Sequence, residues 1–147
     1  MKKLAETWTF SFWGKKNPIP TCNNKYLSDL EYVVFAHEKG VAIFGNYKTK
    51  SKFYISETNK DDKSDFKHPT IKPLPFIKNM VENSSERGGL VLDPFAGSGT
   101  TAVAAKMLNR HFIGFEIEPK YFKIATDRVD GITKKERESG YQQMKLF

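Results

Sequence analysis

The fold is decided by Leu90-Val91-Leu92-Asp93-Pro94-Phe95-Ala96-Gly97-Ser98-Gly99-Thr100-Thr101. This stretch predicts a buried strand, a glycine turn and the first residues of a helix. Gly97 and Gly99 lack a Cβ atom, so the backbone can bend sharply and a ligand can approach it closely. Ser98, Thr100 and Thr101 place hydroxyls and amides at a helix N-terminus, where unpaired N–H groups collect. The pattern suits a charged nucleoside lying over the turn.

A second strand is predicted over residues 111–116, so the unit is β-α-β. Glu116 lies 23 residues after Asp93, at the end of that strand. A carboxylate in this position can accept hydrogen bonds from both hydroxyls of a ribose.

Three kinds of site for a nucleoside-containing ligand can be compared with this pattern. Residues 97–102 satisfy G-x-G-x-x-A, which permits a dinucleotide fold but is a weak signal alone. A phosphate-binding P-loop is excluded because no lysine follows the glycines. The third interpretation is a site for S-adenosylmethionine (AdoMet).

The longer string D-P-F-x-G-S-G-T-T, followed by I-G-F-E-I, favours AdoMet. It closely resembles the AdoMet-binding motif of the DNA amino-methyltransferases, which modify adenine N6 or cytosine N4. The resemblance implies that these residues bind the cofactor: Asp93, Pro94, Phe95, Gly97, Ser98, Gly99, Thr100 and Glu116.

Two further motifs resemble the same family. Residues 68–73 read H-P-T-x-K-P, like the segment that closes over the methionine end of AdoMet. Thr70 and Lys72 are therefore expected near the cofactor carboxylate. Residues 13–20 read W-x-K-x-N-P-x-P and, with Glu31 downstream, resemble the segment that follows the catalytic strands in the β-type motif order.

The resemblance covers roughly residues 8–130 and sets the expected domain organisation. We expect a partial methyltransferase domain over residues 1–130 and a charged tail over residues 131–147. Residues 45–67 form a variable polar insertion and a candidate target-recognition loop.

The catalytic motif of this family, Asp/Asn/Ser-Pro-Pro followed by an aromatic residue, is absent from the sequence. Residues 17–20, Asn-Pro-Ile-Pro, lack both the adjacent prolines and the aromatic residue, so no catalytic residue is assigned. The resemblance implies a Rossmann-like α/β fold with seven strands ordered 3-2-1-4-5-7-6. This chain would supply strands 6, 7, 1 and 2, while strands 3, 4 and 5 are absent. A missing N-terminal part or a complementing subunit is then expected beside the open edges of strands 1 and 7.

Composition favours a polyanionic partner, because 147 residues carry a formal charge of +7. The resemblance indicates double-stranded DNA with a flipped-out base as the partner, and it permits a homodimer. The candidate phosphate contacts are Lys15, Lys16, Asn17, Lys48, Lys50 and Lys52. Cys22 is the only cysteine, which excludes an internal disulfide and a zinc cluster and favours the reducing cytoplasm. No apolar run approaches the length of a membrane span.

Hydrophobic periodicity predicts the remaining elements. Residues 7–13 alternate polar and aromatic side chains, which predicts a strand with one face in water. Residues 31–36 and 41–44 are expected to form a hairpin through Gly40. Helices are predicted after Pro73 and after Pro119. On the second helix we expect five inward side chains: Tyr121, Phe122, Ile124, Ala125 and Val129.

Three functions remain at this point. The first is a DNA amino-methyltransferase or its AdoMet-binding half. The second is an inactive remnant that binds AdoMet or nucleic acid without catalysis. The third is a nicotinamide-dependent oxidoreductase that uses the G-x-G-x-x-A match.

Overall fold

The computed structural model describes residues 7–18, 25–58, 64, 66 and 71–131. The predictions for Cys22, for the segment 68–70 including Thr70, and for the tail beyond Gly131 lie outside the described residues.

A three-stranded sheet comes first in the chain. It contains β1 (Thr7–Lys15), β2 (Leu30–His37) and β3 (Phe53–Ser56), in the order β2-β1-β3. β1 is antiparallel to β2 and parallel to β3. β3 lies within the polar insertion of residues 45–67, where the sequence predicted no strand.

The predicted β-α-β unit is confirmed. β4 (Leu90–Asp93) and β5 (His111–Gly114) form a parallel pair, and α3 (Thr100–Met107) connects them. Two further helices are described, α2 (Leu74–Ser84) and α4 (Pro119–Asp130), and each has a proline in its first turn as predicted.

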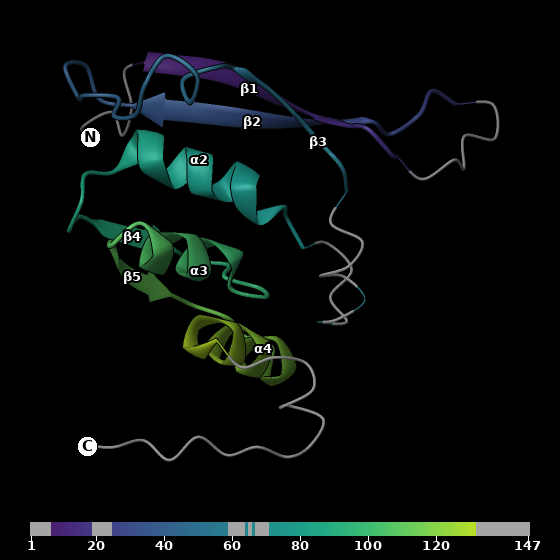
Figure 1. Ribbon diagram of the computed structural model, residues 1–147, viewed down its shortest axis with the longest axis vertical. Helices are drawn as coiled ribbons and strands as arrows, with labels where there is room; N and C mark the ends of the chain where they lie inside the picture. Colours follow the sequence, from purple (N-terminus) through teal and green to yellow (C-terminus); the bar gives the residue numbers. More distant parts are fainter. Residues whose placement is uncertain (1–6, 19–24, 59–63, 65, 67–70, 132–147) are drawn as a thin grey trace, which may run out of the picture.

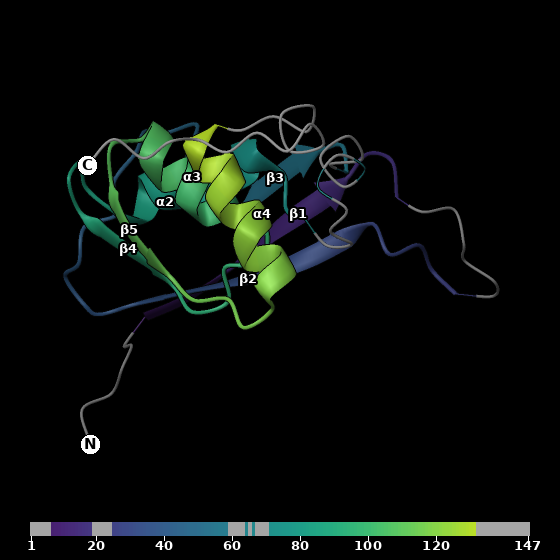
Figure 2. The ribbon, with the colours of Figure 1, turned by 90° about the horizontal axis from the view of Figure 1, so that it is seen from below.

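The two sheets lie on either side of α2 (Figure 1). From top to bottom in that view come β1, β2, α2, the β4–β5 pair with α3, and then α4. Figure 2 shows α2, α3 and α4 together on one side of β4 and β5. This arrangement places the turn between β4 and α3 close to α4.

Aromatic side chains fasten α2 to the three-stranded sheet. Trp13 and Phe76 are both buried, and their rings stack with centroids 5.8 Å apart. The Tyr54 ring lies 5.2 Å from the Phe76 ring. The indole N–H of Trp13 donates to Ser56 Oγ at 2.9 Å, so the buried indole is satisfied.

The predicted hairpin is wrong. Residues 41–44 are not a strand, and β2 instead pairs with β1 in eight consecutive residue pairs, from Thr7–His37 to Gly14–Leu30. Gly40 does make a turn, with φ of 83°. After it, the chain is tied to α2, because the Phe44 N–H donates to the Asn83 carbonyl at 2.9 Å.

The predicted strand with alternating faces is confirmed in β1, and the structure shows which of the two faces is the exposed one. Trp13 faces α2, so Thr9 and Ser11 lie on that covered face. Trp8 and Phe10, on the opposite face, are 63% and 60% exposed. The apolar face of the strand is therefore the open one.

Four of the five side chains expected to face inward on α4 are at least partly buried: Tyr121, Ile124, Ala125 and Val129. Phe122 lines a cavity together with Ala125 and Val129, but it is 57% exposed. Within the described residues no helix is long and apolar enough to cross a membrane. The same residues hold no group of three His, Cys, Asp or Glu side chains placed to bind a metal.

Candidate cofactor site

The turn after β4 is shaped by its own backbone and by Asp93. Asp93 Oδ1 accepts a hydrogen bond from the Phe95 N–H at 3.0 Å, which closes an Asx-type turn. The Ala96 N–H donates to the Phe115 carbonyl at 2.8 Å. Gly97 and Gly99 have φ of 54° and 75°, a conformation that glycine adopts without strain.

Glu116 lies directly against this turn. Its Oε2 accepts a hydrogen bond from the Gly97 N–H at 2.8 Å, and its Oε1 accepts one from the Glu118 N–H at 2.9 Å. Each carboxylate oxygen can accept a second hydrogen bond, and the side chain is only half-buried. The half-buried carboxylate at the turn can therefore still accept two hydroxyl donors.

Gly99 is required for packing as well as for the turn. A Cβ atom at this position would lie 2.8 Å from Ala125 Cβ, closer than real side chains approach. Gly99 is also the N-cap residue of α3. The sequence predicts that Gly99 lets a ligand approach the backbone closely. In the structure, Gly99 lets α4 approach the turn closely.

Ser98 and Thr100 are buried, and Arg128 of α4 binds both. Arg128 Nη1 donates to the Ser98 carbonyl at 2.7 Å, to Ser98 Oγ at 3.1 Å and to Thr100 Oγ1 at 3.0 Å. The Arg128 guanidinium also lies 4.6 Å from the centroid of the Phe66 ring. Ser98 and Thr100 stay predicted cofactor residues, but their hydroxyls contact protein.

Sequence reasoning missed Arg128, although the sequence held a signal for it. Arg128 follows the inward Ala125 by three residues, so a helix places both on one face. A cation on the inner face of the helix after Glu116 needs an acceptor, and the turn after β4 supplies three oxygens.

Phe95 lies open to solvent beside the turn, and the first turn of α3 has no side-chain cap among the described residues. Phe95 is 87% exposed, and Pro94 beside it is exposed as well. Within the described residues, no side chain caps the first turn of α3. Uncapped N–H groups at a helix N-terminus favour an electron-rich ligand.

A cavity of about 250 Å³ lies beside the turn, between α4 and the α3–β5 pair. Ala96, Gly99 and Ala102 line it together with Phe112 of β5. Glu116 is the carboxylate at its wall closest to the turn. The space next to Glu116 is thus not filled by side chains.

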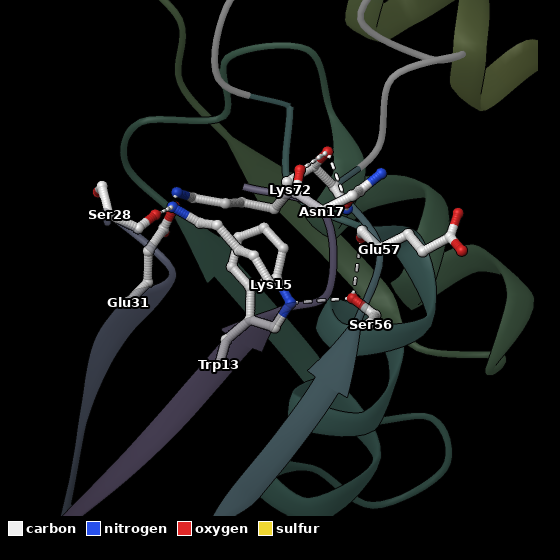
Figure 3. Close-up of polar contacts among 9 residues, drawn as sticks. Trp13, Lys15, Asn17, Ser28, Glu31, Ser56, Glu57 and Lys72 are labelled. Atoms are coloured by element: carbon white, nitrogen blue, oxygen red, sulfur yellow. Dashed lines mark hydrogen bonds and ion pairs between the residues drawn. The ribbon is translucent and has the colours of Figure 1, made fainter. Parts of the chain in front are cut away.

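Lys72 and Lys15 meet at Glu31 (Figure 3). Lys72 Nζ lies 2.5 Å from Glu31 Oε2, and Lys15 Nζ lies 3.0 Å from Oε1. The two ammonium groups also lie 5.8 and 5.5 Å from the ring centroid of Trp13. This cluster ties the first described residues after the H-P-T motif to the three-stranded sheet.

Burial and charge act in opposite directions on Glu31. Partial burial of the carboxyl raises its pKa, but the hydrogen bonds and positive charges of Lys72 and Lys15 outweigh that effect. The net result is a pKa below the ordinary value of 4.5. Because Glu31 holds Lys72, the predicted contact of Lys72 with a cofactor carboxylate would need to compete with this ion pair.

The candidate DNA contacts fall into two groups. Lys15 is 14% exposed and also donates to the Ser28 carbonyl at 3.2 Å, and Asn17 Oδ1 accepts the Thr58 N–H at 2.6 Å. These two side chains hold the sheet and its neighbouring loop. The other four lysines are exposed: Lys16, Lys48, Lys50 and Lys52.

Comparison with known proteins identifies the family. A family model described as DNA methylase matches residues 2–127. The chain is 36% identical over 131 residues to the type II methyltransferase M2.DpnII of Streptococcus pneumoniae, and 33% identical over 134 residues to M2.MboI of Moraxella bovis. These matches cover 80% and 82% of this chain but 49% of each relative.

Solved structures show the same architecture. The M1.HpyAVI–SAM complex has a TM-score of 0.70 and 33% identity, covering 83% of this chain and 61% of that one. A DNA modification methylase of Thermus thermophilus complexed with S-adenosyl-L-methionine gives 0.55 and 25%, covering 84% and 53%. The cytosine-N4-specific PvuII DNA methyltransferase, at 0.67 and 19%, covers 90% and 55% and supports the fold alone.

The fold is therefore an α/β fragment that matches AdoMet methyltransferase structures over about half their length. The chain belongs to the N6/N4 DNA methylase family. It spans about half the length of the curated relatives it matches.

Proposed function

We propose that this chain is the cofactor-binding part of a DNA amino-methyltransferase. When completed by a polypeptide that carries the catalytic motif, it transfers a methyl group from AdoMet to adenine N6 or cytosine N4. The observation that carries the proposal is the position of Glu116, whose Oε2 lies 2.8 Å from the Gly97 N of the glycine turn. A carboxylate beside such a turn can accept hydrogen bonds from the ribose hydroxyls of a nucleoside that lies across the ends of two parallel strands.

The topology supports a specific strand assignment. β1 and β2 would be strands 6 and 7 of the seven-stranded sheet, and β4 and β5 would be strands 1 and 2. The antiparallel pairing of β2 with β1 and the parallel pairing of β4 with β5 fit this order. Strands 4 and 5 would then lie between β4 and β2.

In the proposed complex, each residue at the turn has a separate role in binding the cofactor. When bound, AdoMet supplies an electrophilic methyl group on a positively charged sulfur. Glu116 accepts hydrogen bonds from the ribose, and Asp93 keeps the turn closed through the Phe95 N–H. The exposed Phe95 ring offers an aromatic face to the positive charge. Lys72 is placed at the segment expected to cover the methionine end.

The reaction itself needs the other half of the enzyme. The lone pair of the exocyclic amine forms a new N–C bond with the methyl group while the S–C bond breaks, leaving its electrons on sulfur as a neutral thioether. The amine loses one proton to an acceptor of the catalytic motif or to water. This chain contributes position, and holding two reactants together can supply about 7–11 kcal/mol of a barrier.

Calorimetric titration with AdoMet tests the proposal. We expect Glu116→Gln to weaken binding by about 10-fold or more, because a charged acceptor of ribose hydroxyls is lost. Glu118→Gln is the matched control. The Glu118 side chain is exposed, and Glu118 contacts Glu116 through its backbone N–H, which the substitution keeps. A folded chain that binds no AdoMet, alone or with its completing half, would refute the proposal. Preference for NAD over AdoMet would favour the dinucleotide alternative.

The second candidate is an inactive remnant that binds AdoMet or DNA without catalysis. The observation in its favour is the absence of the Pro-Pro-aromatic motif from the sequence. Labelled AdoMet and duplexes with adenine or cytosine as the target separate the two. Methyl transfer by the completed enzyme excludes the remnant, while AdoMet binding without transfer by that complex supports it.

A further inference from the structure

A second cavity, of about 130 Å³, lies between the three-stranded sheet and the last turns of α2. Its lining residues come from β1, β2, α2 and the loop before β3, and none of them lines the cavity beside Glu116. Lys72 comes just before α2, so the second cavity is at the other end of this helix from the ion pair of Lys72 with Glu31. We call it the α2 cavity.

The lining of the α2 cavity is rich in groups that can donate hydrogen bonds to an anion. Thr9 and Ser11, on the helix-facing side of β1, supply two hydroxyls. The loop before β3 supplies two lysines, Lys50 and Lys52. None of the residues that line the cavity is acidic. Hydroxyl and ammonium groups donate to oxygen, so this set of side chains suits a negatively charged ligand with several oxygens.

Within the described residues, these four side chains are not engaged elsewhere. The hydroxyls of Thr9 and Ser11 make no hydrogen bond there. Lys50 and Lys52 make no ion pair with a described carboxylate. Thr9 and Ser11 are half-buried under α2, where an unpaired polar group costs free energy. A ligand with several acceptor oxygens would remove that cost.

The loop that carries the two lysines is fixed in place. The Thr49 carbonyl, one residue before the first lysine, accepts hydrogen bonds from the side-chain amides of Asn79 and Asn83 at 2.8 and 2.6 Å. The Lys52 carbonyl accepts a hydrogen bond from the Phe12 N–H of β1 at 2.7 Å. The backbone of the loop is thus held beside the cavity before any ligand binds, which lowers the ordering cost of binding.

A phosphate group matches both the size and the donor set of the α2 cavity. At ~30 Å³ per water molecule, 130 Å³ has room for about four waters, and a phosphate ion has five non-hydrogen atoms. Its oxygens point in several directions, so they can accept from the strand hydroxyls and from the loop lysines together. A carboxylate presents two oxygens on one side and would leave more of these donors unpaired.

We propose that the α2 cavity binds a phosphate group through its two hydroxyls and its two lysines. The site is separate from the glycine turn, and it does not depend on the proposed function. Free phosphate and the phosphates of a nucleic-acid backbone share the chemistry that this site recognises. The sequence predicts that Lys50 and Lys52 contact DNA phosphates, and the cavity adds Thr9 and Ser11 to the groups that hold one.

Calorimetric titration of the full chain with inorganic phosphate, at constant ionic strength, tests the site. Lys50→Met and Lys52→Met should each weaken phosphate binding by about 10-fold, because a charge-assisted hydrogen bond is lost. Thr9→Val removes a hydroxyl and nearly keeps the side-chain shape, and it should weaken binding by about 3–5-fold. Lys48→Met is the matched control, because Lys48 is exposed in the same loop but does not line the cavity.

Two results would overturn the proposal. One is a chain that is folded by circular dichroism but shows no saturable phosphate binding below about 10 mM. The other is equal weakening by Lys48→Met and Lys50→Met, since binding would then follow the general surface charge.

A DNA duplex identifies the source of the phosphate. If the duplex displaces inorganic phosphate, and Thr9→Val weakens the binding of both, the site holds a backbone phosphate. If duplex and phosphate bind together, the site holds free phosphate, and either result supports the cavity as a phosphate site. AdoMet titration is read separately: Thr9→Val should leave it unchanged, because Thr9 does not line the cavity beside Glu116. Failure of AdoMet binding would therefore refute the proposed function and leave the phosphate site standing.

Discussion

Arg128 Nη1 donates a hydrogen bond to the carbonyl oxygen of Ser98 at 2.7 Å, and this contact joins the last described helix to the glycine turn. The same nitrogen reaches the hydroxyls of Ser98 and Thr100, which are both buried. Arg128 thus holds the backbone between Gly97 and Thr100 in its turn. In the proposed enzyme it is a positioning residue.

Replacing Arg128 should therefore destabilise the turn. Arg128→Met leaves the oxygens of Ser98 and Thr100 buried without this donor, and each unsatisfied group costs about 1–3 kcal/mol. We expect the free energy of unfolding, measured by urea denaturation, to fall by about 2–4 kcal/mol, with weaker AdoMet binding. Lys120→Met, an exposed change on the same helix, is the control. Equal losses of unfolding free energy in the two variants would show that the Arg128 hydrogen bonds do not stabilise the turn.

Comparing Gly99 with Gly131 separates two costs of adding a side chain: the strain of a positive φ and the steric clash of the new Cβ atom. Gly99→Ala introduces both a φ of 75° on a residue with a side chain and a Cβ atom 2.8 Å from Ala125 Cβ. Gly131→Ala has a similar φ of 79° but nothing within 4 Å of the new Cβ. We expect Gly131→Ala to cost about 1–2 kcal/mol and Gly99→Ala distinctly more.

Thermal unfolding of the two single variants measures this difference. A double variant, Gly99→Ala with Ala125→Gly, removes the contact with Ala125 Cβ but leaves Ala125 Cα 2.9 Å from the new Cβ, so it should recover only a small part of the loss. Recovery to the level of Gly131→Ala would contradict this expectation, because it would show that Ala125 Cβ alone causes the steric cost.

Local pattern was sufficient to predict the β4–α3–β5 unit and the position of Glu116. A short apolar strand, two glycines and a second strand fix this unit within about 25 residues, so few long-range contacts are needed. Helices α2 and α4 were predicted because proline marks the first turn of each.

Long-range pairing explains what sequence reasoning missed. Residues 41–44 have the apolar β-rich composition of a strand, yet β2 finds its partner in β1. The alternation in β1 defines two faces but not which one α2 covers. That choice is made by the packing of Trp13 against Phe76 of α2, and a two-residue period carries no information about it.

Neighbouring lysines should affect DNA binding differently. Lys16 is exposed, whereas Lys15 is 14% exposed and paired with Glu31. If the completed enzyme binds DNA as proposed, Lys16→Ala should weaken binding and lower the salt slope by about one phosphate contact. Lys15→Ala should lower thermal stability and leave the slope unchanged. Fluorescence anisotropy over a salt series measures the slopes, and a larger change for Lys15 would contradict this assignment.

The pH dependence of stability should report the ion pairs of Glu31. Partial burial raises the pKa of the Glu31 carboxyl, but Lys72 and Lys15 outweigh it and hold the pKa below 4.5. Between the two pKa values the unfolded chain binds more protons than the folded chain, so stability rises with pH there. The contribution of Glu31 is therefore complete above about pH 5 and is lost as the pH falls through the folded-state pKa.

Glu31→Gln should remove this pH-dependent contribution. Because the Glu31 side chain is 34% exposed, we expect a difference of at most about 1 kcal/mol from the unmodified chain at pH 7. That difference should shrink progressively in urea denaturation series taken from pH 5 to pH 3. Glu57→Gln, at an exposed side chain on the other side of Lys72, serves as the control for the loss of one negative charge. A difference that stays constant with pH, or grows as the pH falls, would show that Lys72 and Lys15 do not stabilise the Glu31 carboxylate.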